Sequence, residues 1–269
     1  MRHFHILQTC LNRPWLITPQ GHSAVMRAVE ASITHAERAP GVNICGDAVP
    51  VAQMEIVQGT ACIPISGVIG QKLGAMERGF GATDINDVMN DFRAAMADES
   101  VSAIALMIDS PGGTVSGVPE AAAEIAAARG IKPITAYTDG LIASAAYYIA
   151  SSADEIVGTM SSEVGSIGVY QALLDVSRAY ADQGVSVELI KAGKFKAAGY
   201  PGTSLTTEQR AQLQGQVDQI HKMFTDHVKA NRAVSDDAMQ GQTFIGSKAL
   251  EAGLIDRIGS VGVSFQNNR

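Results

Sequence analysis

From residue 55 onward, the chain alternates short β-branched apolar runs with longer stretches of helical periodicity. Strands that alternate with helices in this way are typical of crossover units, in which a helix returns the chain to the next parallel strand. The rhythm predicts an α/β fold of repeated β-β-α and βαβ units around a mostly parallel sheet. The expected strands are 61–65, 103–109, 133–137, 155–159 and 185–190.

Apolar residues at helical spacing fill the intervals between these strands. The expected helices are 84–98, 118–129, 141–153 and 207–232. The third of these, LIASAAYYIASSA, is apolar nearly all round and is expected to be buried. The fourth should begin after Thr206, which has capping-box spacing to Gln209.

Residues 1–54 lack this rhythm and hold four of the six histidines, two of the three cysteines and the only tryptophan. One helix is expected at 22–38, where Val25, Val29, Ile33 and Ala36 share a face. Residues 38–53, with two prolines and two glycines, indicate a linker or an ordered loop. The organisation predicted is an accessory segment at 1–54, a main domain at 55–262 and a C-terminal tail at 263–269.

Composition excludes several classes of partner. The formal net charge of −7 and the lack of a basic cluster argue against nucleic acid and anionic membranes. An odd number of cysteines without metal-ligand spacing fits a reducing compartment. Polar Gln8, Asn12 and Arg13 interrupt what a signal peptide would need as its apolar segment, and no stretch is long and apolar enough to span a bilayer. We expect a cytosolic protein with no membrane anchor.

The first candidate functional motif is DSPGG at 109–113, an expected turn in which a proline and two glycines follow an apolar strand. Such a turn lets the backbone approach a substrate closely. The G-x-S-x-G pentapeptide of many serine hydrolases is absent, and the stretch from 55 to 200 contains no histidine. A lysine can replace histidine as the base if burial lowers its pKa from about 10.4 by up to 3–5 units. That lysine should face a serine hydroxyl beside donors for an oxyanion.

Five segments together resemble the signal peptide peptidase A family of Ser-Lys peptidases, which shares the Clp protease and crotonase type of fold. They occur in order, with family-like spacing, over roughly residues 55–260. The segments are DSPGG (109–113), GLIASAAYYIASSADEIV (140–157), GSIGV (165–169), AGKFKAAGYPGTSLT (192–206) and FIGSKALEAGLIDRIG (244–259).

The resemblance assigns the catalytic side chains. Ser144 matches the nucleophile, at the start of a buried helix where the dipole favours a developing anion. Lys196 matches the general base, with Lys194 as the runner-up, and three lysines in six residues also fit a solvated patch. Ser166 matches a serine that hydrogen-bonds the lysine amine and orients it, although GSIGV is also a plain turn sequence. A packed small residue is the alternative for Ser144.

The resemblance also assigns the oxyanion donors to the backbone N–H groups of Gly113 and Ala145, with Gly112 as the alternative to Gly113. Most family members have two glycines after the serine, where this chain has Ala145 and Ala146. Alanine keeps the N–H and stays small, so the donor can survive. No metal or cofactor is needed by this chemistry, and the carboxylates of Asp109, Asp154 and Asp256 are interpreted as turn or surface groups.

The hypothesis that follows is a serine endopeptidase that works through an acyl-enzyme on peptide or protein substrates, either phage capsid or scaffold proteins or signal-peptide-like peptides. The opening RPWLITPQGHSAVMRAVEA is similar to the phage and prophage branch, whose members process capsid or scaffold proteins, so the compartment would be the host cytoplasm or the procapsid. Relatives of this fold form rings, so we expect a homo-oligomeric ring, a tetramer or an octamer. The alternatives are an acyl-CoA hydratase or isomerase on the same fold, and a catalytically inactive capsid or scaffold component.

Overall fold

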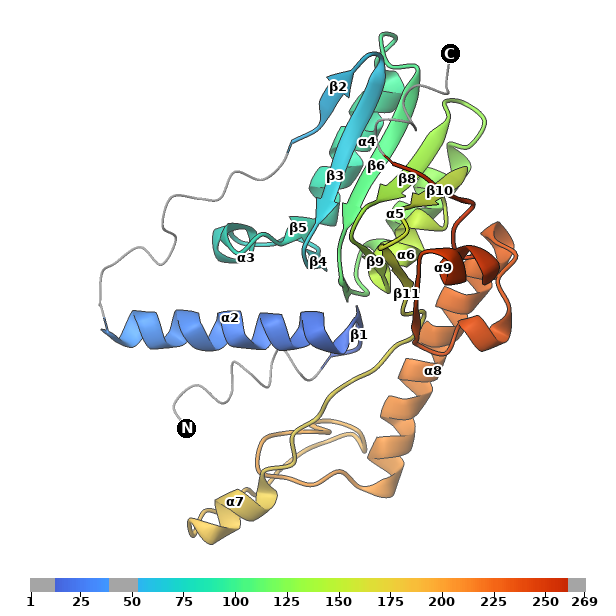
Figure 1. The fold of residues 1–269 in the computed structure, drawn as a ribbon. Helices are drawn as coiled ribbons and strands as arrows, with labels where there is room; N and C mark the ends of the chain where they lie inside the picture. The colour runs from blue at the N-terminus through green and yellow to red at the C-terminus, as the bar shows by residue number, and fades with distance from the viewer. Residues whose placement is uncertain (1–12, 39–52, 261–269) are drawn as a thin grey trace.

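The structure, a computed structural model, describes residues 13–38 and 53–260 and shows a mixed α/β fold whose largest sheet is mostly parallel (Figure 1). In this sheet the strand order is β13-β10-β8-β6-β3-β2, and only β2 runs antiparallel to its neighbour. The strands are β2 (Glu55–Val57), β3 (Thr60–Ser66), β6 (Ala103–Asp109), β8 (Ile134–Thr138), β10 (Glu155–Gly158) and β13 (Arg257–Ile258). The expected α/β architecture is confirmed.

Two smaller sheets continue from the ends of these strands. One has the order β1-β7-β4-β5, with β1 (Trp15–Ile17), β7 (Gly112–Thr114), β4 (Ile69–Gly70) and β5 (Thr83–Asp84). The other has the order β12-β11-β9, with β12 (Thr243–Ile245), β11 (Glu163–Gly165) and β9 (Leu141–Ala143). The N-terminal β1 is thus built into the same sheet as β7, which begins at the second half of the DSPGG turn.

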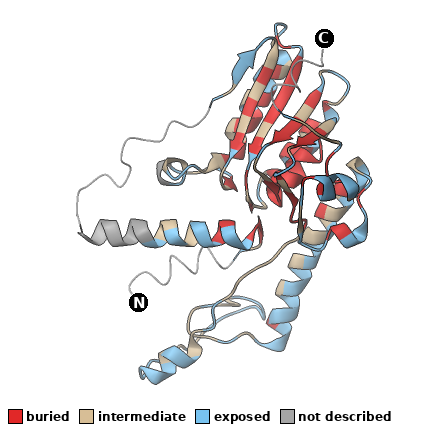
Figure 2. Ribbon diagram, viewed as in Figure 1, coloured by how far each residue is buried: buried red, intermediate tan, exposed pale blue. Residues whose placement is uncertain are grey.

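The described helices are α2 (Pro19–Arg38), α3 (Ala75–Gly79), α4 (Ile85–Ala97), α5 (Val118–Ala127), α6 (Ala145–Ala150), α7 (Ser177–Asp182), α8 (Thr207–Asn231), the 3₁₀ turn η1 (Asp236–Ala238) and α9 (Ser247–Glu251). Several of them, including α4, α5 and α6, pack in the core of the molecule, whereas α7 lies far from the main sheet (Figure 2). The apolar stripe of α4 is buried at Ile85, Val88, Met89 and Phe92, because residues three and four apart share the face that meets the sheet. The apolar side chains of the parallel strands complete this core.

Most of the expected elements are confirmed, and the capping box of α8 is present: the Thr206 side chain accepts from the Gln209 N–H and the Gln209 side chain accepts from the Thr206 N–H. The expected helix at 22–38 is confirmed as part of α2, which starts three residues earlier. Most of the proposed linker lies in 39–52, and the proposed tail in 261–269, outside the described residues. The division at residue 54 stays a prediction.

Two expectations are wrong. Residues 185–190 form no strand, because they lie in an exposed part of the chain with no neighbouring strand to pair with; Ile190 is 98% exposed. Residues 141–153 are not one helix: β9 comes first, Ser144 makes a turn, and α6 follows. The run is buried throughout most of its length, as expected, because both the strand and the helix lie in the core.

The segment 171–206, here called the arm, leaves the body of the molecule and carries α7 at its far end (Figure 1). No residue of the arm is buried (Figure 2). The first half of α8 runs back beside it, so Leu213, Val217 and Ile220 of the expected apolar stripe are only half-buried, whereas Phe224 and Val228 reach the core.

The three aspartates bind backbone groups, as expected of turn residues. The carboxylate of Asp109 accepts from the Leu141 N–H at 3.1 Å, Asp154 from the Ile134 N–H at 2.8 Å, and Asp256 from the Ile156 N–H at 2.6 Å. Each bond ties one strand to a neighbouring segment, so the carboxylates act in the fold.

Candidate active site

Ser144 occupies a strained turn between β9 and α6. Its φ of 57° and ψ of −115° are uncommon for a residue other than glycine, and strain of this kind concentrates at functional sites. A serine that precedes a helix usually caps it with its side chain, but the Ser144 hydroxyl makes no capping bond. Its Oγ is buried and, among the described residues, has no hydrogen-bond partner. The backbone therefore holds a buried hydroxyl with no structural task.

The DSPGG turn lies directly against Ser144. The Ala143 N–H donates to the Ser110 carbonyl at 3.1 Å, which joins the turn to the residue before the serine. A Cβ on Gly112 would lie 2.9 Å from Ser144 Cβ and 3.0 Å from the Ala143 carbonyl oxygen, with φ at +99°. Only glycine lets the two backbones approach this closely. The turn and the serine, separated in sequence by some thirty residues, thus form one site.

Gly112 and Gly113 differ in what their N–H groups do. The Gly112 N–H donates to the Ser110 Oγ at 3.1 Å, so it already has a partner within the turn. Gly113 is the middle residue of β7 and pairs with β1 on one side and β4 on the other. The choice between Gly113 and Gly112 as an oxyanion donor stays a prediction.

The second expected donor, the Ala145 N–H, belongs to the first turn of α6, where N–H groups have no partner within the helix. Ala145 and Ala146 are both completely buried, so their methyl groups fit the core at this point. The opposite end of α6 is anchored as well. Arg129 donates to the Ser152 carbonyl at 2.8 Å and Arg232 to the Ala153 carbonyl at 2.8 Å, which fixes the helix that carries the donor.

Ser166 lies at the end of the strand next to the nucleophile. β9 and β11 are parallel, with Ala143 opposite Gly165, so their carboxyl ends bring Ser144 and Ser166 to the same edge. The Ser144 N–H donates to the Gly165 carbonyl at 2.8 Å. Ser166 is 7% exposed and also has a positive φ, of 53°. The structure thus brings together Ser144, Ser166 and the glycine turn.

The structure does not bring Lys196 to this group. Lys196 lies exposed on the arm, and within the described chain its side chain has no ion pair or hydrogen bond. Lys194, the runner-up, is also exposed and pairs with Glu208 at 3.2 Å. The sequence argument asked for a sheltered lysine that touches the serine, and a single chain does not provide it, because the whole arm projects away from the sheet. The choice between the two lysines stays a prediction.

Two histidines from outside the stretch 55–200 make partly buried contacts that no sequence pattern indicated. His22 Nδ1 lies 2.8 Å from the Tyr170 hydroxyl, and His227 Nε2 lies 2.9 Å from the Ser152 hydroxyl. Burial lowers the pKa of both histidines, which favours neutral rings. Neither bonds the Ser144 hydroxyl, which has no partner in the part of the chain described.

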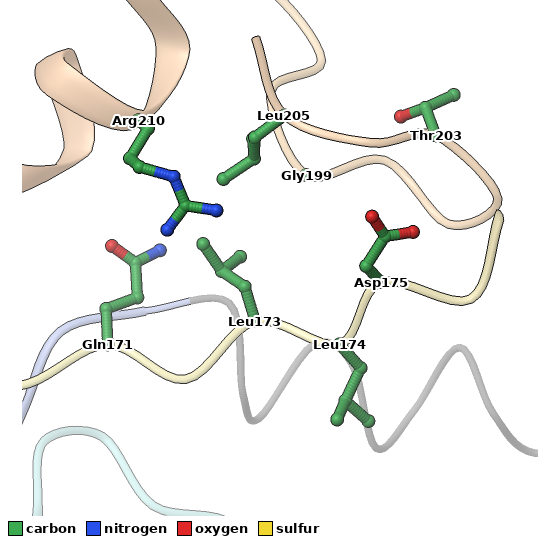
Figure 3. Close-up of a pocket in the computed structure, with 8 residues that line it drawn as sticks. All are labelled: Gln171, Leu173, Leu174, Asp175, Gly199, Thr203, Leu205 and Arg210. Carbon is green, nitrogen blue, oxygen red and sulfur yellow. The ribbon is translucent and has the colours of Figure 1, made fainter. Parts of the chain in front are cut away.

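A cavity of about 240 Å³ lies where the arm meets α8 (Figure 3). The side chains of Gln171, Leu173 and Leu205 face it, together with the guanidinium of Arg210. Ser144 does not line this cavity. Sequence analysis missed it because its walls come from two segments that no local pattern links.

Comparison with known proteins decides the family. The sequence profile of peptidase family S49 matches residues 126–266, about half of the chain and a range that includes Ser144, Ser166 and Lys196. The chain belongs to peptidase family S49. The resemblance read from the five segments is thereby confirmed.

Relatives of known name agree with this family. The chain is 30% identical over 274 residues to capsid assembly protease C of Escherichia phage lambda and to head-tail preconnector protein GP5 of Enterobacteria phage P21, matching 94% of this chain in each case. It covers 62% and 54% of those two proteins, so it spans only part of their length. Chloroplastic serine protease SPPA of Arabidopsis thaliana is 27% identical, over 75% of this chain and 30% of the relative.

Among solved structures, an enoyl-CoA hydratase from Shewanella pealeana aligns with a TM-score of 0.45 at 11% identity, covering 82% of this chain and 73% of that one. A likeness this distant carries nothing about chemistry.

Within the described ranges, no helix is both long enough and apolar enough to cross a membrane.

Proposed function

We propose that this S49 chain is a serine endopeptidase in which Ser144 is the nucleophile and Lys196 the general base. The lysine amine takes the proton from the Ser144 hydroxyl as its oxygen attacks a peptide carbonyl. The N–H groups of Gly113 and Ala145 bind the oxyanion, and the proton passes to the leaving amine. Water then attacks the acyl-enzyme and restores the serine. Ser166 orients the lysine amine.

The buried, unbonded hydroxyl of Ser144 on its strained turn is the observation that carries this proposal. A packed small residue needs neither the strain nor an orphaned polar atom, since a buried hydroxyl without a partner costs free energy. The glycine turn beside it supplies the second requirement, a backbone donor at close approach.

The base is proposed to come from another copy of the chain. Lys196 lies on an arm that has no buried residue, and the arm carries exposed apolar side chains that include Ile190 at 98%, Tyr200 at 51% and Phe195 at 43%. Apolar surface of this kind is typical of an interface. An arm that packs on a neighbouring copy in a tetrameric or octameric ring would be sheltered there, and burial favours the neutral amine that a base requires.

The substrate is proposed to be a protein of an assembling phage capsid. This extension depends on the lambda relative, named for capsid assembly and protease, and on the match along 94% of this chain. The place of action would then be the host cytoplasm or the procapsid. The acyl-CoA hydratase or isomerase alternative draws on carboxylates for its acid and base, and membership of a peptidase family favours peptide hydrolysis over it.

The test compares the wild-type chain with Ser144→Ala, Lys196→Ala and Lys194→Ala. Each is incubated with a fluorophosphonate probe and with a casein substrate. We expect labelling and turnover in the wild type, loss of both in Ser144→Ala, loss of turnover in Lys196→Ala and retention in Lys194→Ala. Retained turnover in Ser144→Ala would refute the nucleophile, and the absence of both labelling and casein hydrolysis in every form of the chain, including variants that weaken β1, would support the inactive capsid component instead.

A further inference from the structure

The N-terminal strand β1 lies between β7, which begins in the glycine turn beside Ser144, and Tyr170, four residues after Ser166. On one side it pairs antiparallel with β7, with Trp15 opposite Thr114, Leu16 opposite Gly113 and Ile17 opposite Gly112. On the other side the Trp15 N–H donates to the Tyr170 carbonyl at 2.9 Å, and the Tyr170 N–H returns a bond to the Trp15 carbonyl at 3.3 Å. β1 is therefore the outermost strand of its sheet, and its outer edge is covered by a single bridge to Tyr170.

The bonds at the end of β1 show which groups face each other. The Thr18 N–H donates to the Pro111 carbonyl at 2.9 Å, so these opposite residues form a hydrogen-bonded pair. Hydrogen-bonded and non-hydrogen-bonded pairs alternate along an antiparallel ladder. Leu16 and Gly113, two positions along, are then also a hydrogen-bonded pair, in which the Gly113 N–H faces the Leu16 carbonyl. That N–H is the proposed oxyanion donor.

The Leu16 carbonyl also borders the nucleophile. A Cβ built on Gly112 would overlap the Leu16 carbonyl oxygen and would lie 2.9 Å from Ser144 Cβ, so both atoms face the same small space in front of the glycine. An extended peptide whose carbonyl meets an oxyanion donor beside a serine has the placement of a substrate. β1 has this placement and belongs to the same chain.

Side chains lock β1 in place. Trp15, Leu16 and Ile17 are 5%, 0% and 2% exposed, respectively. The Trp15 ring packs on His22 at 5.1 Å between centroids, and His22 is bonded to Tyr170. Behind β1, Gly21 at the start of α2 packs against Pro111 of the DSPGG turn. A second extended peptide cannot pair with β7 at these positions while β1 is there.

We propose that β1 is an internal pseudosubstrate, so the chain in this arrangement is self-inhibited. The inference rests on the proposed peptidase function and deepens it, because it also assigns the substrate class. A substrate must replace β1 as an extended strand between β7 and Tyr170, with an aliphatic side chain at the position of Leu16 and an apolar one before it. β-strand addition of this kind takes its affinity from backbone bonds and its selectivity from alternate side-chain pockets.

The first test weakens β1 in the full chain with Leu16→Asp, which places a carboxylate where Leu16 is completely buried. Trp15 is the only tryptophan of the protein, so its fluorescence reports directly whether β1 has left. We expect a red-shifted emission and fluorophosphonate labelling of Ser144 that is faster by about tenfold, because the competent fraction of the chains rises. Ile131→Asp, at a site 69% exposed, is the matched control and should behave as the wild type.

The second test does not depend on catalysis or on the folding of Leu16→Asp. The Ser144→Ala chain is titrated with a blocked peptide of the sequence PFLITP, which copies residues 14–19 with phenylalanine in place of the emitting tryptophan. We expect a saturable red shift of Trp15, and none with PFDITP.

Displacement of Trp15 without labelling of Ser144 in any variant would show that β1 can be exchanged for a peptide, and would refute the peptidase function and with it the role of β1 as a pseudosubstrate. Two results would overturn the pseudosubstrate. One is a Trp15 emission that neither PFLITP nor PFDITP changes, in a protein whose wild-type form is labelled at Ser144. The other is release of Trp15 in Leu16→Asp without faster labelling of a Ser144 that the wild type does label.

Discussion

Gly112→Ala tests the contact on which the site depends. The new Cβ would overlap the Leu16 carbonyl oxygen and lie 2.9 Å from Ser144 Cβ and 3.0 Å from the Ala143 carbonyl oxygen. Two of these three atoms are backbone, so no flexible side-chain end can move aside. The positive φ of +99° adds about 1–2 kcal/mol of strain for any L-residue, and overpacking in a dense site adds about 1–3 kcal/mol.

The expected result is a loss of activity that exceeds the loss of stability. Displacement of β1 would relieve only the overlap with the Leu16 carbonyl oxygen. Relief of the contacts with Ser144 Cβ and the Ala143 carbonyl oxygen requires Ser144 or the turn to shift by several tenths of an ångström, and misplacement of reacting groups by about 1 Å can cost about 100-fold in rate. The assay measures turnover of an extended apolar peptide, together with the unfolding free energy from denaturant titration.

Gly130→Ala is the matched control for this variant. Gly130 has a similar φ of +78°, but a Cβ there would meet no atom within 4 Å. It should lose about 1–2 kcal/mol of unfolding free energy through the backbone alone and keep its activity. If Gly112→Ala hydrolysed the peptide at the wild-type rate with the stability of Gly130→Ala, the close approach of the turn to Ser144 would be wrong.

Three further predictions concern the arm, α8 and the buried histidine. If the base comes from a neighbouring copy, an equal mixture of Ser144→Ala and Lys196→Ala chains, dissociated and reassembled, should recover about a quarter of the wild-type rate, and no recovery would place the lysine and the serine in one chain. Gly215→Ala should raise the unfolding free energy by about 0.5–1 kcal/mol, because Gly215 lies inside α8 and a Cβ there meets no atom within 4 Å; a chemical denaturation midpoint that falls would refute this. Burial lowers the pKa of His227, so the folded chain holds the neutral ring, and the stability this gives is present above the ordinary histidine pKa of about 6.5 and is lost as the pH falls below it. A thermal midpoint in His227→Phe that falls as much as that of the wild type between pH 7 and pH 5 would contradict this.

The sequence predicted the α/β architecture and the elements of the main sheet because those elements are long enough to show a period. β3 and β6 pair over seven residues, and the stripe of α4 repeats over three turns. Their burial depends on side chains a few positions apart, which local periodicity measures directly. Motif order along the chain then located Ser144 and the DSPGG turn.

Residues 185–190 show where this reasoning fails. Val185, Val187 and Ile190 have the β-branched side chains typical of strands, but β-propensity reflects a fit to a half-buried pleated surface and requires a partner strand. The arm offers none within one chain. A copy that covers the arm would supply the missing surface.

β1 was missed for the opposite reason. It has only three residues, and it pairs with Gly112–Thr114, almost one hundred positions further along the chain. A three-residue apolar run has no period to detect, and the register that places Leu16 opposite Gly113 is a property of the folded chain. The one signal for β1 in the sequence is its single tryptophan. A residue this large and apolar is usually well buried, and Trp15 lay in no expected helix or strand.

The two halves of the proposed site differ in how the fold fixes them, and this difference predicts how activity depends on protein concentration. Backbone bonds at the ends of buried strands fix Ser144 and the glycine turn, so each folded chain contains them. Lys196 lies on an exposed arm, so its position depends on what covers the arm. A lone chain then has its nucleophile in place and its base far from it.

The rate per chain should therefore rise with concentration as the chains assemble, since each contact between copies delivers one lysine to one serine. Turnover is measured with a short peptide across the concentration range in which light scattering shows the mass to change. The control is Ile56→Asp, on β2 at the far edge of the main sheet, which leaves the arm untouched and should follow the wild type. A rate per chain that stays constant while the mass changes would mean that one chain completes the site with its own lysine.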